Sequence, residues 1–442
     1  MSAPAITAVV CVDIGSTWTK AALVELPDGR LQATAQAPTT PGDVVRGVLT
    51  ATEGFAEAPV LACSSAGGGL RLAVVGYEAL ISAEAGHRVA LSAGARVVHV
   101  AAGLLDDRGL AALWAAAPDV VLLVGGTDGG EASVLRANAA TLAGAGRYVP
   151  VVLAGNAAVR DEVAALLRAA GLPVTEAENV LPDIGRLAPE PARAAIREVF
   201  LRHVIGGDTL STDPRLRRWV RTVTPDAVLA AVAALADLWT TAEAPGTVVV
   251  DVGGATTDVY CAPGPDAERA SLGREAVGAP PVRRTVEGDL GVATSADALR
   301  AAAAAEGVPL PGGDLLDLGA AAATVALRRH LRAEAAYGAG GAGARGAGLV
   351  VLSGGVFRHA EPAALEAAVA RIAADAGGAG GVLARADVVV DRRYVLAPAG
   401  LLAAEHPGAA AGLLGGLLDG RPPGFLSGGR ASRPTSRPTP PR

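Results

Sequence analysis

The chain has 442 residues, enough for two large domains, and 51% of them are hydrophobic, so a sizeable core can form. Its formal net charge is -6 and its aromatic content is 3%. Both values argue against a nucleic-acid-binding protein, because such proteins carry basic surfaces and aromatic side chains on which bases stack.

Metal and membrane signals are also weak. Cys11, Cys63 and Cys261 lie far apart without a CxxC motif, and no two histidines are spaced as HxxxH or HxxH. This pattern favours buried, reduced thiols over a structural zinc site. The first residues lack a basic region, and the apolar stretch at 409–418 is short and rich in glycine. We therefore expect a cytoplasmic protein with no export signal and no membrane contact.

The chain begins with a predicted three-stranded antiparallel sheet. Residues 5–13 and 19–26 form two strands, and a Pro-Asp-Gly-Arg turn at 27–30 leads to a third strand at 31–37. Residues 41–52 look helical. The turn between the first two strands contains an aspartate, a glycine and hydroxyl side chains.

Two more strands follow, and then the pattern changes. A strand at 59–64 runs into a glycine-rich loop, and residues 70–75 return as another strand. From 78 to 175 the pattern changes to repeating βα units, which predicts a parallel sheet with ligand-binding loops at its carboxyl edge. The loop at 125–130 reads GGTDGG and fits neither the dinucleotide nor the P-loop spacing. Its Asp128 is either a ligand of phosphate-bound water or a turn former.

Several helices are expected in the middle of the chain. Within the βα region, residues 79–95 and 131–143 are predicted to be helical. Residues 191–204 predict an amphipathic helix, and residues 214–239 look mainly helical with a break near Pro225. Such a helical segment can cross between two lobes.

A second hairpin repeats the first one. Residues 249–259 read VVDVGGATTDV, and residues 10–20 read VCVDIGSTWTK. The aligned pairs are Asp13 with Asp251, Ile14 with Val252, Gly15 with Gly253 and Thr19 with Thr257. The glycines let a phosphate approach backbone N–H groups, and the aspartates can hold a hydrated Mg²⁺. Either stretch alone could be an ordinary hairpin, but the repeat favours two lobes that offer one turn each to a nucleotide.

A third glycine turn follows in the second half. Residues 349–359 read LVVLSGGVFRH, which predicts a strand, a Ser-Gly-Gly turn and a helix start. The glycines would let an adenosine approach, although a routine strand-to-helix connection with a serine cap is the alternative. The remaining predicted elements are a strand and turn at 282–290, helices at 295–306, 315–336 and 361–374, a strand at 387–390 and a last helix at 397–404. Composition predicts disorder beyond about residue 420.

The order of the three turns resembles the actin, heat-shock chaperone and sugar kinase ATPase superfamily, with its phosphate 1, phosphate 2 and adenosine motifs. The resemblance implies a two-lobed actin-like α/β fold, in which each lobe is a ribonuclease-H-like mixed sheet with flanking helices, plus an α/β insertion in the first half. The implied domains are a first-lobe core at 1–100, its α/β and helical continuation at 101–244, a second lobe at 245–405 and a disordered tail at 420–442.

A narrower resemblance covers about residues 5–405. It is carried by GGTDGG at 125–130, AGN at 154–156, ENVLPDIG at 178–185, RTVEGDLG at 284–291 and LAPAGLL at 396–402. These stretches look like the glutamate mutase MutL family, the methylaspartate mutase accessory protein, which is unrelated to the mismatch-repair protein of that name. The chain departs from the expected pattern at Leu352, where a glycine would precede the Ser-Gly-Gly.

The resemblance implies a role for each motif residue. The assigned groups are Asp13 and Asp251 for Mg²⁺ through water; Gly15, Ser16, Thr17 and Lys20 for the β- and γ-phosphates; Gly253, Gly254 and Thr256 for the γ-phosphate; Gly354 and Gly355 for adenosine; and Asp128 and Asp258 as candidate bases for the attacking water. Catalysis would rest on positioning and charge neutralisation around Asp13, Asp251 and Asp128.

The expected protein is an ATP- and Mg²⁺-binding, slowly ATP-hydrolysing accessory protein that reactivates an adenosylcobalamin-dependent mutase and binds its subunits. ATP touching both lobes would favour a closed state that hydrolysis releases. The alternatives are a small-molecule kinase of the same fold and a non-catalytic nucleotide-binding scaffold. An iron–sulfur activator is disfavoured, because the cysteines are few and dispersed.

Overall fold

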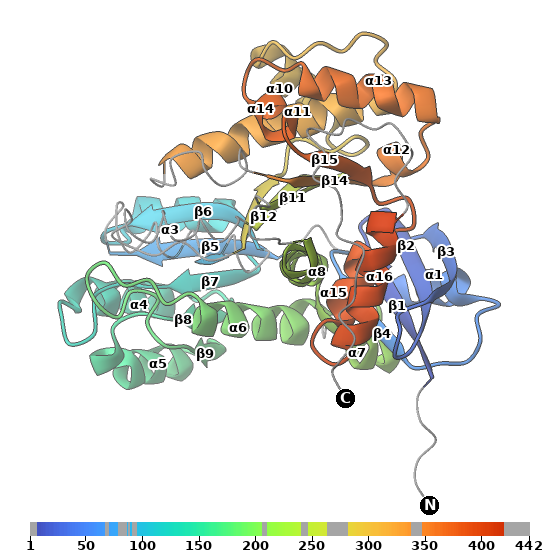
Figure 1. Cartoon of the computed structure of the whole chain (residues 1–442). Coiled ribbons are helices and arrows are strands. Elements are labelled where there is room, and N and C mark those ends of the chain that lie inside the picture. Colours follow the sequence, from blue (N-terminus) through green and yellow to red (C-terminus); the bar gives the residue numbers. More distant parts are fainter. Residues whose placement is uncertain are drawn as a thin grey trace, which may run out of the picture.

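The structure is a computed structural model in which three five-stranded sheets and their helices are arranged around a central helical layer (Figure 1). It describes residues 7–66, 70–77, 86, 89–90, 95–205, 210–239, 246–262, 282–336 and 347–419. The predicted helix at 79–95 falls mostly outside these residues, and the predicted tail at 420–442 falls wholly outside them.

The first sheet has the strand order β10-β4-β1-β2-β3. Its strands are β1 (Ala8–Ile14), β2 (Trp18–Glu25), β3 (Leu31–Pro38), β4 (Val60–Ser64) and β10 (Val220–Val223). The first three are antiparallel neighbours, whereas β4 pairs in parallel with both β1 and β10. Helix α1 (Val44–Thr52) packs beside β2 and β3.

The second sheet repeats this arrangement in the order β13-β12-β11-β14-β15. Its strands are β11 (Thr247–Val252), β12 (Thr257–Ala262), β13 (Arg283–Glu287), β14 (Leu349–Ser353) and β15 (Asp387–Val390). Again three antiparallel strands are followed by two parallel ones. The prediction of two ribonuclease-H-like mixed sheets is confirmed, because both sheets share one topology.

The third sheet lies between β4 and β10 in the chain and is parallel throughout, in the order β6-β5-β7-β8-β9. Its strands are β5 (Arg71–Gly76), β6 (Arg96–Ala102), β7 (Val120–Leu123), β8 (Val151–Leu153) and β9 (Val174–Glu176). The helices with it are α3 (Asp107–Ala115), α4 (Ser133–Gly144), α5 (Arg160–Ala169) and α6 (Glu190–Val199), with a π-helix, η2 (Phe200–Ile205), after α6. The predicted α/β insertion is confirmed.

Strands β1 and β11 are buried on both faces, which explains their continuous runs of β-branched residues. Alternate side chains enter different cores because strand residues alternate in direction. In β1, Val10 and Val12 contribute to one core and Val9 to another. In β11, Val250 packs into the core of the second lobe, whereas Val249 shares its core with Val9. The shared core joins the two sheets.

Helices from distant parts of the chain fill this shared core. They are α8 (Thr224–Trp239), α15 (Leu396–Leu402) and α16 (Pro407–Asp419). The opposite side of the second sheet is covered by α10 (Ala296–Ala305), α11 (Leu315–Ala336), α12 (Gly355–Arg358), α13 (Pro362–Ala373) and α14 (Ala379–Leu383) (Figure 1). Within the described ranges, no helix is both long enough and apolar enough to cross a membrane.

The segment 214–239 is mainly helical with a break near Pro225, as predicted, because α7 (Pro214–Trp219) and α8 make up most of it. The strand in the break was not predicted: β10 separates the two helices and pairs with β4. The helix at 397–404 is not the last one, since α16 follows it. Glycines lower the helix propensity of α16, yet they let it approach the turn after β2 closely. A Cβ atom added to Gly412 would lie 1.8 Å from the Asp28 carbonyl oxygen.

Candidate functional site

The two Asp-Gly hairpins meet at their turns. The N–H groups of Gly15 and Gly253 each donate to the carbonyl three residues later, at 3.1 and 2.9 Å, so both turns close in the same way. A Cβ atom added to Gly254 would lie 3.4 Å from Thr17 Oγ1. The first and second sheets therefore bring their glycine turns into contact, although 238 positions separate Asp13 from Asp251.

Both turns present backbone donors. Among the described residues, no hydrogen-bond partner is found for the N–H groups of Ser16, Thr17, Gly254 and Ala255. Successive unpaired N–H groups in a turn form a concave site that favours an anion. The turns thus have the donor arrangement that phosphate binding requires.

Neighbouring residues hold the carbonyl groups of these turns. Thr39 donates from Oγ1 to the Gly15 carbonyl at 2.8 Å and from N–H to the Thr17 carbonyl at 2.9 Å. Ala293 N–H donates to the Gly254 carbonyl at 2.9 Å, and Ser295 Oγ donates to the Ala255 carbonyl at 2.8 Å. Because C=O and the following N–H point in opposite directions in a trans peptide, these bonds also fix the direction of the turn N–H groups.

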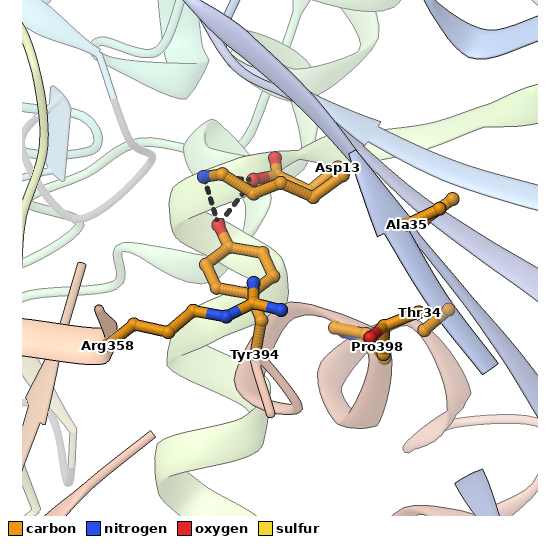
Figure 2. A pocket seen from close by; sticks show the side chains of 9 residues that line it. Asp13, Thr34, Ala35, Arg358, Tyr394 and Pro398 are labelled. Atoms are coloured by element: carbon orange, nitrogen blue, oxygen red, sulfur yellow. Dashed lines mark hydrogen bonds and ion pairs between the residues drawn. The ribbon is translucent and has the colours of Figure 1, made fainter. Parts of the chain in front are cut away.

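Asp13 is the last residue but one of β1 and is buried, with 3% of its surface exposed. Its Oδ1 atom accepts from Thr224 Oγ1 at 2.6 Å and from Cys63 Sγ at 3.6 Å. Its Oδ2 atom accepts from Tyr394 Oη at 2.5 Å and from Lys20 Nζ at 3.4 Å. Lys20 Nζ also donates to Tyr394 Oη at 2.7 Å (Figure 2). Lys20 therefore sits beside the predicted metal ligand, which it faces in register across β1 and β2.

Asp251 is the last residue but one of β11, where its register partners are Asp258 in β12 and Ser353 in β14. Burial raises the pKa of the Asp251 carboxyl to about 6, while the charge of Lys20 and a hydrogen bond with Ser353 oppose this rise; the charges of Asp258 and Asp13 add to it. The carboxylates of Asp13 and Asp251, from different lobes, are thus close enough to repel each other. Their oxygen atoms suit a hydrated Mg²⁺, which would relieve this repulsion.

The two candidate bases have different surroundings. Asp258 accepts from Arg284 Nε at 2.9 Å and from Thr256 Oγ1 at 3.3 Å, so both of its oxygens are in use beside the second turn. Asp128 lies in the loop after β7, where its Oδ1 accepts from Ala157 N–H and Asn179 Nδ2, both at 2.8 Å. The contacts of Asp128 organise the carboxyl edge of the third sheet, and none of them reaches a hairpin.

The Ser-Gly-Gly turn follows β14, next to Asp251. Gly354 has φ +115, and a Cβ atom there would lie 2.2 Å from the Val252 carbonyl oxygen, so only glycine fits. Gly355 is exposed and would meet nothing within 4 Å. The fold therefore requires glycine at position 354, whereas position 355 faces open space and has room for a side chain. Leu352, the departure from the expected pattern, is fully buried in β14.

Sequence reasoning missed Tyr394, Thr224 and Thr39. Tyr394 lies between β15 and α15, and it lines a small pocket together with Asp13, Lys20 and Arg358 (Figure 2). The family-like stretch at 396–402 begins two residues after it. No local pattern marks any of the three, because each contacts its partner through the tertiary fold.

A second cluster of chemical interest lies inside the second lobe. All three cysteines are buried and unpaired, as predicted, but Cys261 also approaches His330 and Glu334, with their ligand atoms within 4.8 Å of one another. Arg283 Nη1 lies 3.4 Å from Glu334 Oε1, and Thr285 Oγ1 lies 3.0 Å from His330 Nδ1. The guanidinium group balances the carboxylate, so this cluster has the chemistry of a buried hydrogen-bond network.

Comparison with known proteins gives one family. A family model described as MutL protein matches residues 9–309 and 315–417. Protein MutL of Clostridium tetanomorphum is 36% identical over 303 residues, which span 66% of this chain and 66% of that protein's length.

Solved structures align only loosely. Xylulose kinase of Bifidobacterium adolescentis shares 14% identity at a TM-score of 0.33, covering 95% of each chain. A nucleotide-free structure of acetone carboxylase shares 14% identity at a TM-score of 0.34, covering 90% of this chain and 71% of the other. Scores this low carry no argument about function.

Proposed function

The chain belongs to the MutL protein family, and on that premise we propose that it binds Mg-ATP between its lobes and acts as an accessory, reactivating protein of an adenosylcobalamin-dependent mutase. One observation carries the nucleotide part of this proposal. Two glycine turns from different sheets lie together, and each has N–H groups without a partner among the described residues and an aspartate one residue before the end of its first strand.

The proposed site divides its work between the two lobes. Asp13 and Asp251 would hold Mg²⁺ through water, and the metal would neutralise phosphate charge. The backbone donors proposed for phosphate oxygens are the N–H groups of Ser16, Thr17, Gly254 and Ala255. Lys20 would add positive charge, and Thr256 would add a hydroxyl donor near the γ-phosphate.

Turnover is proposed to be slow. Asp258 already accepts bonds from Arg284 and Thr256, and the contacts of Asp128 lie in the third sheet. Neither carboxylate is placed to take a proton from an attacking water without rearrangement. The same observation favours the second candidate function, a nucleotide-binding scaffold without hydrolysis.

The proposed output is a change in the distance between the lobes. A nucleotide that contacts both turns stabilises the arrangement in which they touch, and loss of the γ-phosphate removes part of that bridge. Because α8 and α15 pack between both sheets, this change would alter the shared core and reach the rest of the chain. A mutase bound to the outer surface could then be opened to exchange damaged cobalamin.

Calorimetry with Mg-ATP tests the site. Asp251→Ala should weaken binding by at least about a hundredfold, because the variant loses a charged metal partner. Asp128→Ala is the matched control and should leave the affinity unchanged. Equal affinities for the Asp251→Ala variant and the native protein would refute the assignment.

The partner is tested separately. The protein is used to capture binding partners from its native cell, and any recovered mutase is inactivated and then incubated with the protein and Mg-ATP. Reactivation with phosphate release supports the chaperone, and reactivation without phosphate release supports the scaffold. Phosphate release that rises with a small acceptor molecule, and not with a mutase, would favour a kinase instead.

A further inference from the structure

We propose that Tyr394 is an inter-lobe latch whose hydroxyl competes with hydrated Mg²⁺ for Asp13 and thereby sets the affinity of the site for Mg-nucleotides. The inference rests on the proposed function, since it assumes that Asp13 is where the metal binds. It adds a residue that no motif contains.

The acceptor capacity of Asp13 is already filled. A carboxylate has about four lone-pair sites, and the donors that reach Asp13 are Thr224, Cys63, Tyr394 and Lys20. A metal-bound water can donate to Asp13 only if one of these donors leaves.

Tyr394 is the donor that can leave most easily. Cys63 lies in β4 and Lys20 in β2, and both strands pair directly with β1. Thr224 begins α8 immediately after β10, which is another strand of the same sheet. Tyr394, in contrast, lies on the segment that leaves β15 of the second sheet and enters α15. Of the four donors, it alone lies on a segment that comes directly from the second sheet.

The backbone at Tyr394 is held in an uncommon conformation. Its φ is +56, which is costly for a residue with an aromatic side chain. The buried carboxylate of Asp391 holds the turn, because it accepts from the N–H groups of Val395 at 2.9 Å and Leu396 at 3.2 Å. A residue held against its preferred backbone conformation gains from release once its hydroxyl loses its acceptor.

The ring of Tyr394 also connects the metal side of the site with the Ser-Gly-Gly turn. Lys20 Nζ lies 4.1 Å from the ring centroid, and the Arg358 guanidinium lies 5.9 Å from it. Figure 2 shows the hydroxyl directed at Asp13 and Arg358 alongside the ring. Arg358 ends α12, which starts at Gly355. Contacts at the predicted adenosine turn and at Asp13 thus converge on one side chain.

The variant Tyr394→Phe tests the latch, because it removes the hydroxyl and keeps the ring between its two cations. Calorimetry should show Mg-ATP binding about tenfold tighter than in the native protein, the change expected from losing one competing charge-assisted hydrogen bond. ATP with EDTA should show no such gain, since no metal then competes for Asp13. Tyr148→Phe, at an exposed tyrosine, should behave like the native protein.

The possible outcomes separate the latch from the function. If the native protein binds Mg-ATP and Tyr394→Phe binds it equally or more weakly, the latch is wrong and the nucleotide site stands. If neither protein binds Mg-ATP, both proposals fail. Binding that is measurable only in Tyr394→Phe supports both.

Hydrogen exchange gives a readout that does not depend on affinity. Saturating Mg-ATP should speed exchange at Val395 and Leu396 in the native protein, because the turn is released with Tyr394. Tyr394→Phe should show this faster exchange already without nucleotide, and its melting temperature confirms that it is folded. Unchanged exchange of the 391–396 segment in the saturated native protein would overturn the latch.

Discussion

Tyr394 and Asp13 lie 381 positions apart, yet their side chains share a hydrogen bond of 2.5 Å. The bond joins the segment that leaves the second sheet to the first strand of the first sheet. It lies beside the place where two glycine turns touch, and Lys20 bonds to both of its partners. The site therefore combines the backbone N–H groups of two glycine turns with a side-chain contact between the lobes.

Asp251 should cost the protein stability at neutral pH. Its pKa of about 6 in the folded state lies above the value near 4 of an unfolded aspartate. The carboxyl therefore stays protonated to a higher pH in the folded state than in the unfolded state. The free energy of unfolding falls as the pH rises from about 4 to about 6. Asp251→Asn cannot ionise, so in EDTA it should be about 1–3 kcal/mol more stable than the native protein at pH 8.

Urea denaturation at pH 8 and pH 4 measures this difference. The gain in the Asn variant should fall to about 0.5 kcal/mol or less at pH 4, where the native carboxyl is protonated in the folded state and about half protonated in the unfolded state. An Asn variant that is less stable than the native protein at pH 8 would contradict the assigned environment of Asp251. A gain in stability together with lost Mg-ATP binding would mark Asp251 as a residue kept for function.

Thr39 should support nucleotide binding without touching the ligand. Its hydroxyl and N–H hold the carbonyls of Gly15 and Thr17. Thr39→Val keeps the shape of the side chain and removes the hydroxyl bond, which should cost about 1 kcal/mol of stability and loosen the first turn. We expect Mg-ATP affinity to fall about threefold to tenfold in calorimetry. Thr50→Val, at an exposed position of α1, is the control, and equal affinities for both variants would rule out the support role.

Much of this fold could be predicted from local patterns. The hairpins around Asp13 and Asp251 combine β-branched strands with a glycine turn, and the third sheet repeats βα units over a long stretch. Strand β10 could not be predicted, because four residues between two helices carry too little periodicity, and only pairing with β4 makes them a strand.

The candidate site divides in the same way. Gly15 and Gly253 can be recognised in the sequence, because a tight turn needs glycine wherever it occurs in the fold. Thr39 and Tyr394 act through partners 24 and 381 positions away, so nothing in their own neighbourhoods distinguishes them from ordinary polar residues. Sequence patterns reveal what the backbone requires locally, and they leave out the side chains that the tertiary fold brings in.

The two glycines of the Ser-Gly-Gly turn should respond differently to alanine. Gly354 has φ +115 and faces the Val252 carbonyl oxygen, so Gly354→Ala should destabilise the protein by about 2–4 kcal/mol. Gly355→Ala meets open space and should leave stability within about 0.5 kcal/mol. Denaturant titration compares the two, and similar losses would show that the turn is packed differently. Mg-ATP affinity of Gly355→Ala then tests directly whether this position approaches a nucleotide.

A last pair of glycines tests how tightly the helical layer joins the lobes. A Cβ atom on Gly400 in α15 would lie 1.7 Å from the Ala227 carbonyl oxygen in α8, whereas one on Gly415 in α16 would meet nothing within 4 Å. Gly400→Ala should push the helices apart and destabilise the protein by about 3 kcal/mol or more. Gly415→Ala should instead stabilise it by about 0.5–1 kcal/mol, because alanine favours a helix. Thermal melting measures both changes in stability.

Since α15 begins two residues after Tyr394, Gly400→Ala should also move the latch and change Mg-ATP affinity, while Gly415→Ala should not. A Gly400→Ala variant with native stability and native affinity would mean that α8 and α15 do not cross as closely as described.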